Sequence, residues 1–256
     1  MAGQSATPLP LVVHGARALG LSLTDGQLRQ LDELARLLAE RAKRFSLTSI
    51  RTFDDIQVAH LLDSLTPVPY IDHLAENDQN ESRTDEAIRV VDVGSGAGLP
   101  GLVLAIALPA IEVTLVEATS KKAAFIDEAI SVLGLQNARV IQGRAEDVGR
   151  DPQFRERFNV AIARAVASSP TLVELLVPLL RVGGRAIFMK TEQAADEVRA
   201  SGRALEALDS VVERVVEVRG IASLRNRMLI IVKKRSNSDG RYPRRVGVPH
   251  HHPIGL

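Results

Sequence analysis

The sequence predicts an α/β fold in which a seven-stranded, mostly parallel sheet carries helices on both faces. From residue 87 onward, short apolar runs alternate with amphipathic stretches of helical length, as in parallel sheets with helical crossovers. The last two apolar runs are separated by only nine residues, so we expect these two strands to pair antiparallel. A glycine-rich turn directly follows the first run, as in doubly wound, Rossmann-like sheets.

The seven expected strands are rich in β-branched and aliphatic residues. They are Arg89–Val93, Glu112–Val116, Arg139–Ile141, Val160–Ala163, Arg185–Met189, Val211–Val218 and Met228–Lys233. Helical segments separate the first five, for example Lys121–Leu133 and Ser168–Leu180.

The residues before the sheet should form a small helical region. Leucines recur at spacings of three and four within Leu19–Arg44, and Thr24 with Gln27 makes a capping box at its start. A second helix should run over Asp54–Leu65 and end before the next prolines. The polar, acidic segment His73–Asp85 reads as a linker.

Charge divides the chain unevenly. From Arg225 to the end there are eight Lys or Arg against one acid, a net charge of +7, whereas the whole chain carries +1 and the remainder therefore −6. A basic end on an acidic body suggests a polyanionic partner, although a solvated, disordered tail has the same composition. We expect three parts: the helical region and linker 1–86, the sheet domain 87–235 and a basic tail 236–256.

Composition excludes several classes of site. The chain has no cysteine, so disulfides, zinc–cysteine sites and a cysteine nucleophile are ruled out. No run of about 18 apolar residues predicts a membrane span, and Met1–Pro10 lacks the pattern of a secretory signal. We therefore expect a cytoplasmic protein without membrane contact.

The segment from Val90 to Gly101, Val-Val-Asp-Val-Gly-Ser-Gly-Ala-Gly-Leu-Pro-Gly, predicts a nucleotide-type cofactor site. A strand runs into glycines that let the backbone turn sharply near a ligand. Glu117 ends the next strand and can hold ribose hydroxyls. The run from Gly96 to Gly101 also matches the dinucleotide pattern G-x-G-x-x-G, so an NAD-dependent oxidoreductase is the alternative.

Three features favour S-adenosylmethionine over NAD. Asp92 stands two residues before the first glycine, as in many methyltransferases. The sheet continues as one unit without a second catalytic domain, and no catalytic pair for hydride transfer is visible. Glu146 or Asp147, after the third strand, can read the adenine edge, although acids there also start helices.

The residues after the fourth strand limit the methyl acceptor. The Asn/Asp-Pro-Pro-aromatic motif that orients an exocyclic amine is missing, and so is the cysteine used for carbon-5 methylation. A ring nitrogen such as guanine N7 remains, because its in-plane lone pair needs positioning and no general base. Arg164 can orient a guanine or a phosphate, with an ion pair to a carboxylate as its alternative role. Lys190 ends the fifth strand at the same edge of the sheet.

Four stretches resemble the ribosomal small-subunit methyltransferase G family, also called glucose-inhibited division protein B. They are Phe45-Ser-Leu-Thr48 with His60-Leu-Leu-Asp-Ser-Leu65, Asp92–Gly101, Ala163-Arg-Ala-Val-Ala167, and the tail from Arg241 to Pro253. The resemblance implies a class I methyltransferase fold and methylation of N7 of a guanine, usually numbered 527, in the decoding-region loop of 16S rRNA. Its partner is then 16S rRNA, the small ribosomal subunit or an assembly intermediate, and we expect a monomer.

The resemblance also implies site residues. Gly94, Leu99, Ala145, Glu146 and Arg164 should line the S-adenosylmethionine site, to which the motif itself adds Asp92, Gly96 and Gly98 and the end of the next strand adds Glu117. From strand ends and charge, apart from the resemblance, we expect Arg164 and Lys190 as catalytic residues and Arg227, Arg241, Arg244 and Arg245 as RNA contacts. The chain departs from the family pattern at Ser46, Thr191, His250 and His251, where the family has Asn, Gly and two lysines. We expect no metal at the adjacent histidines. A binding module that has lost catalysis is the non-enzymatic alternative.

Overall fold

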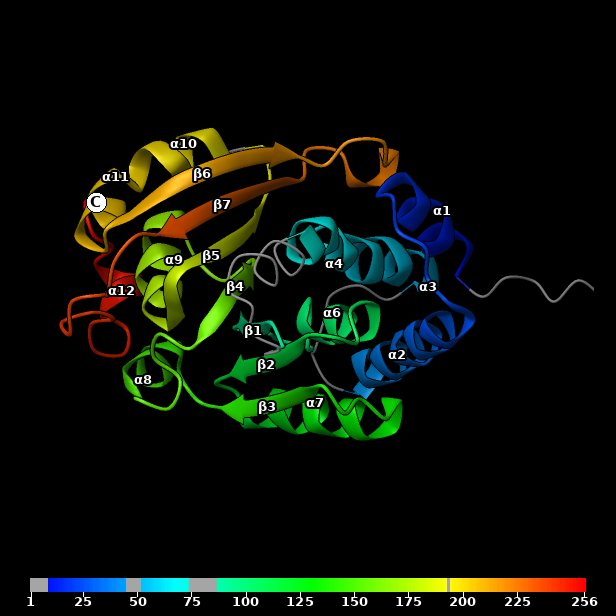
Figure 1. Cartoon of the computed structure of the whole chain (residues 1–256). Helices are drawn as coiled ribbons and strands as arrows, with labels where there is room; N and C mark the ends of the chain where they lie inside the picture. The colour runs from blue at the N-terminus through cyan, green and yellow to red at the C-terminus, as the bar shows by residue number, and fades with distance from the viewer. Residues whose placement is uncertain (1–8, 45–51, 74–86, 193) are drawn as a thin grey trace, which may run out of the picture.

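The computed structural model describes residues 9–44, 52–73, 87–192 and 194–256, which fold around one seven-stranded sheet (Figure 1). The strand order is β3-β2-β1-β4-β5-β7-β6, and β7 alone runs opposite to the other six strands. This topology confirms the expected doubly wound sheet, with the order reversing between β1 and β4. The strands are β1 (Arg89–Val93), β2 (Glu112–Glu117), β3 (Ala138–Gln142), β4 (Phe158–Arg164), β5 (Leu180–Lys190), β6 (Ser210–Glu217) and β7 (Met228–Lys234).

Helices cover both faces of the sheet and create two cores. Val90 and Leu115 point to one core, whereas Val91 and Val116 point to the other. Because strands of this kind are buried on both sides, they read as continuous apolar runs, which made them easy to find in the sequence. The helices after the strands are α6 (Gly101–Ala107), α7 (Ser120–Leu133), α8 (Ala145–Arg150), α9 (Ser169–Leu176), α10 (Ala194–Ala200) and α11 (Gly202–Ala207).

The N-terminal helices pack on the α6 and α7 side of the sheet (Figure 1). The Thr24–Gln27 capping box is confirmed, because the Thr24 amide donates to Gln27 Oε1 at 2.8 Å and the Gln27 amide donates to Thr24 Oγ1 at 3.2 Å. Gln27 Nε2 also donates to the carbonyls of Ile106 and Ala107, each at 3.0 Å. The first turn of the helix that begins at Asp25 is thereby fastened to the end of α6. The elements are α1 (Pro10–Ala18), α2 (Asp25–Arg44), α3 (Phe53–Asp55), the π-helical η1 (Ile56–Leu62) and α4 (Asp63–Leu65).

Several element boundaries differ from the sequence prediction. The helix expected over Ser168–Leu180 ends at Leu176 and continues as the 3₁₀ turn η2 (Val177–Leu179), because Pro178 has no amide to donate within a helix. The helix expected from Leu19 begins only at Asp25, and α1, α10 and α11 were not predicted. Residues 45–48 of the first motif and 74–85 of the expected linker lie outside the described residues. In the part of the chain that is described, no helix is long and apolar enough to span a bilayer.

The C-terminal segment follows the surface of the sheet domain. Its only helix among the described residues is α12 (Val248–His251). The Arg155 guanidinium donates to the carbonyls of Tyr242 at 2.7 Å and Ser238 at 2.8 Å, and Arg150 donates to that of Pro243 at 2.7 Å. The segment is mostly irregular, as expected, but it is packed and not a free, solvated tail.

Candidate active site

The glycine turn between β1 and α6 depends on left-handed backbone conformations. Gly94, Gly96 and Gly98 have φ angles of 70°, 59° and 80°, which favour glycine. A Cβ at Gly94 would lie 2.8 Å from Val166 Cγ2, so the turn also packs tightly there. At Gly96, by contrast, the nearest atom to a Cβ would be 4.0 Å away, which leaves open space for a ligand above this residue.

Asp92 lies buried beneath the turn. Its Oδ2 accepts a hydrogen bond from the Gly101 amide at 2.9 Å, while Oδ1 has no hydrogen-bond partner among the described residues. Burial raises the pKa of Asp92 to about 6, although the hydrogen bond from the Gly101 amide and the nearby Ser95 hydroxyl oppose this change. Asp92 therefore positions the start of α6, and its other buried oxygen receives no hydrogen bond from the part of the chain that is described.

The carboxylate of Glu117 is fixed against the same turn. Its Oε2 accepts from the Gly96 amide at 2.9 Å, and its Oε1 accepts from the Thr119 amide at 2.7 Å. The residue is buried, with 6% of its surface exposed. Because each carboxylate oxygen can accept more than one hydrogen bond, Glu117 can still receive two hydroxyl groups from a ribose.

A cavity of about 410 Å³ opens beside the turn, and we name it the glycine cavity. Among the expected cofactor residues, Gly94, Ala145 and Glu146 line it. Leu99 belongs to the core, Arg164 lines a different cavity, and Asp92, Gly96, Gly98 and Glu117 are not among the lining residues. Its lining comprises Val93, Gly94, Val116, Ala118, Gly143, Arg144, Ala145, Glu146, Val166, Ala167, Thr171, Leu175, Val246, Gly247, His250 and His251.

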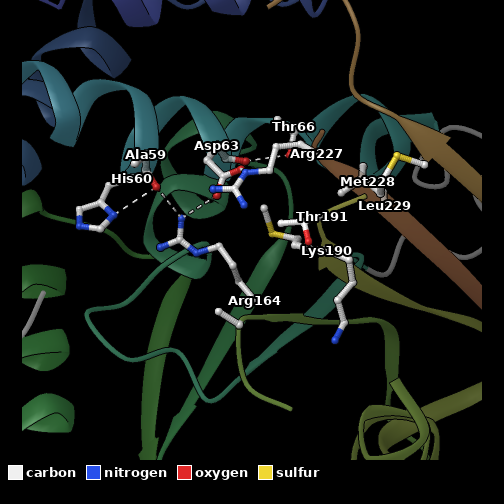
Figure 2. A pocket seen from close by; sticks show the side chains of 12 residues that line it. Ala59, His60, Asp63, Thr66, Arg164, Lys190, Thr191, Arg227, Met228 and Leu229 are labelled. Carbon is white, nitrogen blue, oxygen red and sulfur yellow. Dashed lines mark hydrogen bonds and ion pairs between the residues drawn. The ribbon is translucent and has the colours of Figure 1, made fainter. Parts of the chain in front are cut away.

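A second cavity, of about 380 Å³, lies at the ends of β4, β5 and β7, and we name it the arginine cavity (Figure 2). The segment 164–167 borders both cavities, because Arg164 and Ala165 line this one while Val166 and Ala167 line the glycine cavity. The two spaces therefore adjoin beside the point where the strand order reverses, where α/β sheets bind ligands. The arginine cavity is lined by Ala59, His60, Asp63, Thr66, Arg164, Ala165, Met189, Lys190, Thr191, Arg227, Met228 and Leu229.

Asp63 joins the two arginines of this cavity, as Figure 2 shows. Arg164 Nη1 lies 3.1 Å from Asp63 Oδ2 and donates to the Ala59 carbonyl at 3.0 Å, while Arg227 Nε lies 3.1 Å from Asp63 Oδ1. Only 4% of the Asp63 side chain is exposed. The ion pair considered for Arg164 is therefore present. Sequence reasoning assigned Asp63 no role, although it lies in one of the four stretches that carry the family resemblance.

His60 lines the arginine cavity one turn before Asp63. Burial lowers the pKa of its imidazole, and the nearby Arg164 guanidinium lowers it further. His60 and Asp63 belong to the continuous helix that contains η1, and π-helical segments often occur at functional sites. The N-terminal helical region thus contributes directly to the arginine cavity.

Lys190 reaches the rim of the cavity but points elsewhere. Its side chain runs away from Asp63 in Figure 2, and Nζ contacts the Ala167 carbonyl at 2.6 Å and Glu197 Oε2 at 2.7 Å. Glu197 Oε2 also accepts from the Ser169 amide at 2.8 Å. These hydrogen bonds outweigh the effect of burial and lower the pKa of Glu197. Lys190 therefore holds the segment after β4 in place.

The basic residues expected to contact RNA have different surroundings. Arg244 Nη2 lies 2.6 Å from Oε2 of Glu174, whose side chain is fully buried. Arg241 pairs with Asp239 and is 76% exposed. The Arg245 side chain is exposed, and no ion pair to it is found among the described residues. In the same part of the chain, no cluster of three or more His, Asp or Glu is placed to hold a metal ion.

Known proteins with similar sequences cover nearly the whole chain. The family model GidB, described as rRNA small subunit methyltransferase G, matches residues 27–227. A relative of this description from Roseiflexus sp. is 41% identical over 251 residues, which are 96% of this chain and 100% of the relative. Another, from Pelotomaculum thermopropionicum, is 37% identical over 243 residues, 95% of this chain and 97% of the relative. With its glycine turn, Glu117 and the adjoining arginine cavity, the chain belongs to the rRNA small subunit methyltransferase G family.

Proposed function

We propose that this protein transfers the methyl group of S-adenosylmethionine to N7 of a guanine in 16S rRNA, the nucleotide usually numbered 527. The observation that carries the proposal is the pair of adjoining cavities, one beside the glycine turn and one lined by arginines, which meet at residues 164–167. The proposal includes action as a monomer in the cytoplasm on the small ribosomal subunit or an assembly intermediate.

The glycine cavity fits S-adenosylmethionine. When bound, the cofactor supplies an electrophilic methyl group on its sulfonium. Next to the lining residues of this cavity, Glu117 has the fixed, buried carboxylate that ribose hydroxyls need, and Gly96 leaves open space beside that carboxylate. Glu146 lies where the cavity reaches the end of β3 and can accept from the adenine edge. The segment 164–167 then separates the reactive end of the cofactor from the acceptor.

The arginine cavity suits a guanine base taken out of its stack. A base must leave the RNA stack before a side chain can surround it, which costs a few kcal/mol. Arg164 and Arg227 present guanidinium groups, whose fork geometry matches the O6 acceptor of guanine or a phosphate. N7 loses no proton when it is methylated, so these residues need only orient the base. The lowered pKa of His60 is compatible with such a site, since it favours the neutral imidazole.

Membership of the methyltransferase family argues against an NAD-dependent oxidoreductase, although the run from Gly96 to Gly101 matches the dinucleotide pattern. In this structure, a Cβ at Gly101 would lie 2.6 Å from Leu115 Cδ2 and 2.9 Å from Asp92 Oδ2. The last glycine of the pattern thus serves close packing of α6 against the sheet. That role is common to both kinds of nucleotide fold.

The decisive experiment is methyl transfer from labelled S-adenosylmethionine to 30S subunits from a strain that lacks this activity, followed by mapping of the modified nucleotide. We expect one modified guanine in the decoding-region loop, with a labile N7-methyl signature. Naked 16S rRNA and a partly assembled particle, tested in parallel, identify the form of the substrate. Label at another position, or in protein, would contradict the proposal, and no label at all would favour a binding module without catalysis.

A further inference from the structure

The C-terminal segment is fixed to the body of the protein on both sides of Val246 and Gly247. Before them, the backbone amide of Arg244 donates to Glu174 Oε1 at 2.7 Å, in addition to the guanidinium contacts with the same carboxylate. After them, Thr171 Oγ1 donates to the Pro249 carbonyl at 2.9 Å in a buried position. Glu174 and Thr171 both belong to α9, so the segment is attached at two points of one helix.

Glu146 connects this segment to the expected cofactor residues. It is buried, and its Oε1 accepts from the Gly247 amide at 2.9 Å. Gly247 has a φ of 83°, and a Cβ there would lie 3.6 Å from Cδ2 of His251, so the His251 ring packs over this glycine. The His250 ring stands nearly perpendicular to it, with centroids 5.5 Å apart. Both histidines therefore have defined positions on the wall of the glycine cavity.

The order of groups along the sheet indicates what this wall faces. If the methyl group lies at the segment after β4 and the ribose lies at Glu117 on β2, the adenine lies beyond them, at the end of β3. Residues 143–146 stand at that end, and Val246, Gly247, His250 and His251 complete the same cavity.

We infer that the C-terminal segment 244–251 is a wall of the cofactor site, and that the rings of His250 and His251 contact the adenosine part of S-adenosylmethionine. The inference rests on the cofactor placement proposed above. Imidazole rings can stack on a purine or donate to its ring nitrogens. The segment then has a role in cofactor binding in addition to the RNA contact that its charge suggested.

Calorimetric titration without RNA tests the inference. The ligands are S-adenosylhomocysteine and 5′-methylthioadenosine, which share the nucleoside but differ in the amino-acid part. We expect the double variant His250→Ala with His251→Ala to bind both ligands about tenfold more weakly and by the same factor, in the range found for loss of base stacking. The matched control is His252→Ala, because His252 is exposed and does not line the glycine cavity. It should bind both ligands as the wild type does.

Three results would overturn the inference. The first is unchanged affinity of the double variant for both ligands. The second is a loss for S-adenosylhomocysteine without a loss for 5′-methylthioadenosine, which would place the histidines at the amino-acid part. The third is an equal loss in His252→Ala. Failure of the cofactor assignment itself is recognised separately, because then the wild type would bind neither ligand. Thermal unfolding of each variant shows whether the fold is kept, which we expect because both rings are exposed.

Discussion

Arg244 and Arg245 are neighbours of the same type with opposite expected roles. Sequence reasoning assigned both to RNA, but the structure places the Arg244 guanidinium against Glu174 and leaves the Arg245 side chain exposed. Arg244→Ala should therefore lower the free energy of unfolding without changing the salt dependence of RNA binding. Arg245→Ala should reduce the salt dependence of RNA binding and leave the free energy of unfolding nearly unchanged.

The magnitude follows from the burial of Glu174, whose side chain is fully inaccessible to solvent. Removing one partner of a buried ion pair costs about 3–5 kcal/mol. The Arg244 backbone amide still donates to Glu174 in the variant, so we expect the lower end, about 3 kcal/mol. For a chain of this size that corresponds to a fall in Tm of about 6–12 °C. Arg245→Ala should change stability by less than about 0.5 kcal/mol.

Thermal unfolding monitored by circular dichroism measures both variants. Adding Glu174→Gln to Arg244→Ala should restore at least half of the lost Tm, because a neutral amide costs less to bury than an unpaired carboxylate. Filter binding of 16S rRNA over a range of KCl concentrations gives the second readout, and loss of one phosphate contact in Arg245→Ala should reduce the log–log slope by about 0.7–0.9. Equal, small changes of Tm in the two single variants would refute the reasoning.

Three further changes test the remaining parts of the site. Asp63→Asn should lower kcat/KM for 30S methylation about tenfold or more, because it weakens the charged hydrogen bonds to both arginines. Calorimetry should give unchanged affinity of this variant for S-adenosylhomocysteine. A loss of that affinity by the same factor would mean that Asp63 acts on the cofactor. Gly96→Asp should abolish S-adenosylhomocysteine binding, because it fills the open space and adds a charge beside Glu117. Its control is Gly134→Asp, at a surface glycine with a similar φ of 64° and no atom within 4 Å of a Cβ, which should keep the affinity. Asp92 has a folded-state pKa raised by burial to about 6, above its ordinary value, so its stabilising contribution is complete below about pH 4 and is lost as the pH rises through 6. Urea unfolding from pH 4 to 7 should show about 3 kcal/mol of this loss in the wild type but not in Asp92→Asn; parallel pH profiles of the two proteins would argue against it.

The parts of the site that the sequence predicted are local. The strand, the glycine turn, Asp92 and Glu117 were found because adjacent residues or the end of the next strand determine their geometry. The parts that the sequence missed are pairings over long distances. Asp63 and Arg164 are 101 residues apart, and so are Glu146 and Gly247. Which acid meets which donor depends on how the N-terminal helices and the C-terminal segment pack on the sheet, and neither periodicity nor spacing contains that information.

For Lys190, strand topology predicted the position of the residue but not the direction of its side chain. The end of β5 does lie at the edge of the arginine cavity, as expected for a strand end at this edge of the sheet. The direction of the side chain depends instead on Glu197 in α10, a helix that the sequence analysis did not predict. A strand-end position therefore predicted the neighbourhood of Lys190 and not its partner.

The distribution of ion pairs changes how RNA recognition by this protein must be understood. Of the four arginines expected to contact RNA, Arg227 and Arg244 already pair with buried carboxylates, and Arg241 pairs with Asp239. Although basic residues are numerous here, most of these arginines are neutralised by an acidic partner in the described part of the site. Because diffuse charge is what drives non-specific binding to phosphates, the arrangement favours recognition by shape and by oriented donors. Asp63 is central to this, since one buried carboxylate sets the direction of both guanidinium groups in the arginine cavity and reduces their attraction for any passing phosphate.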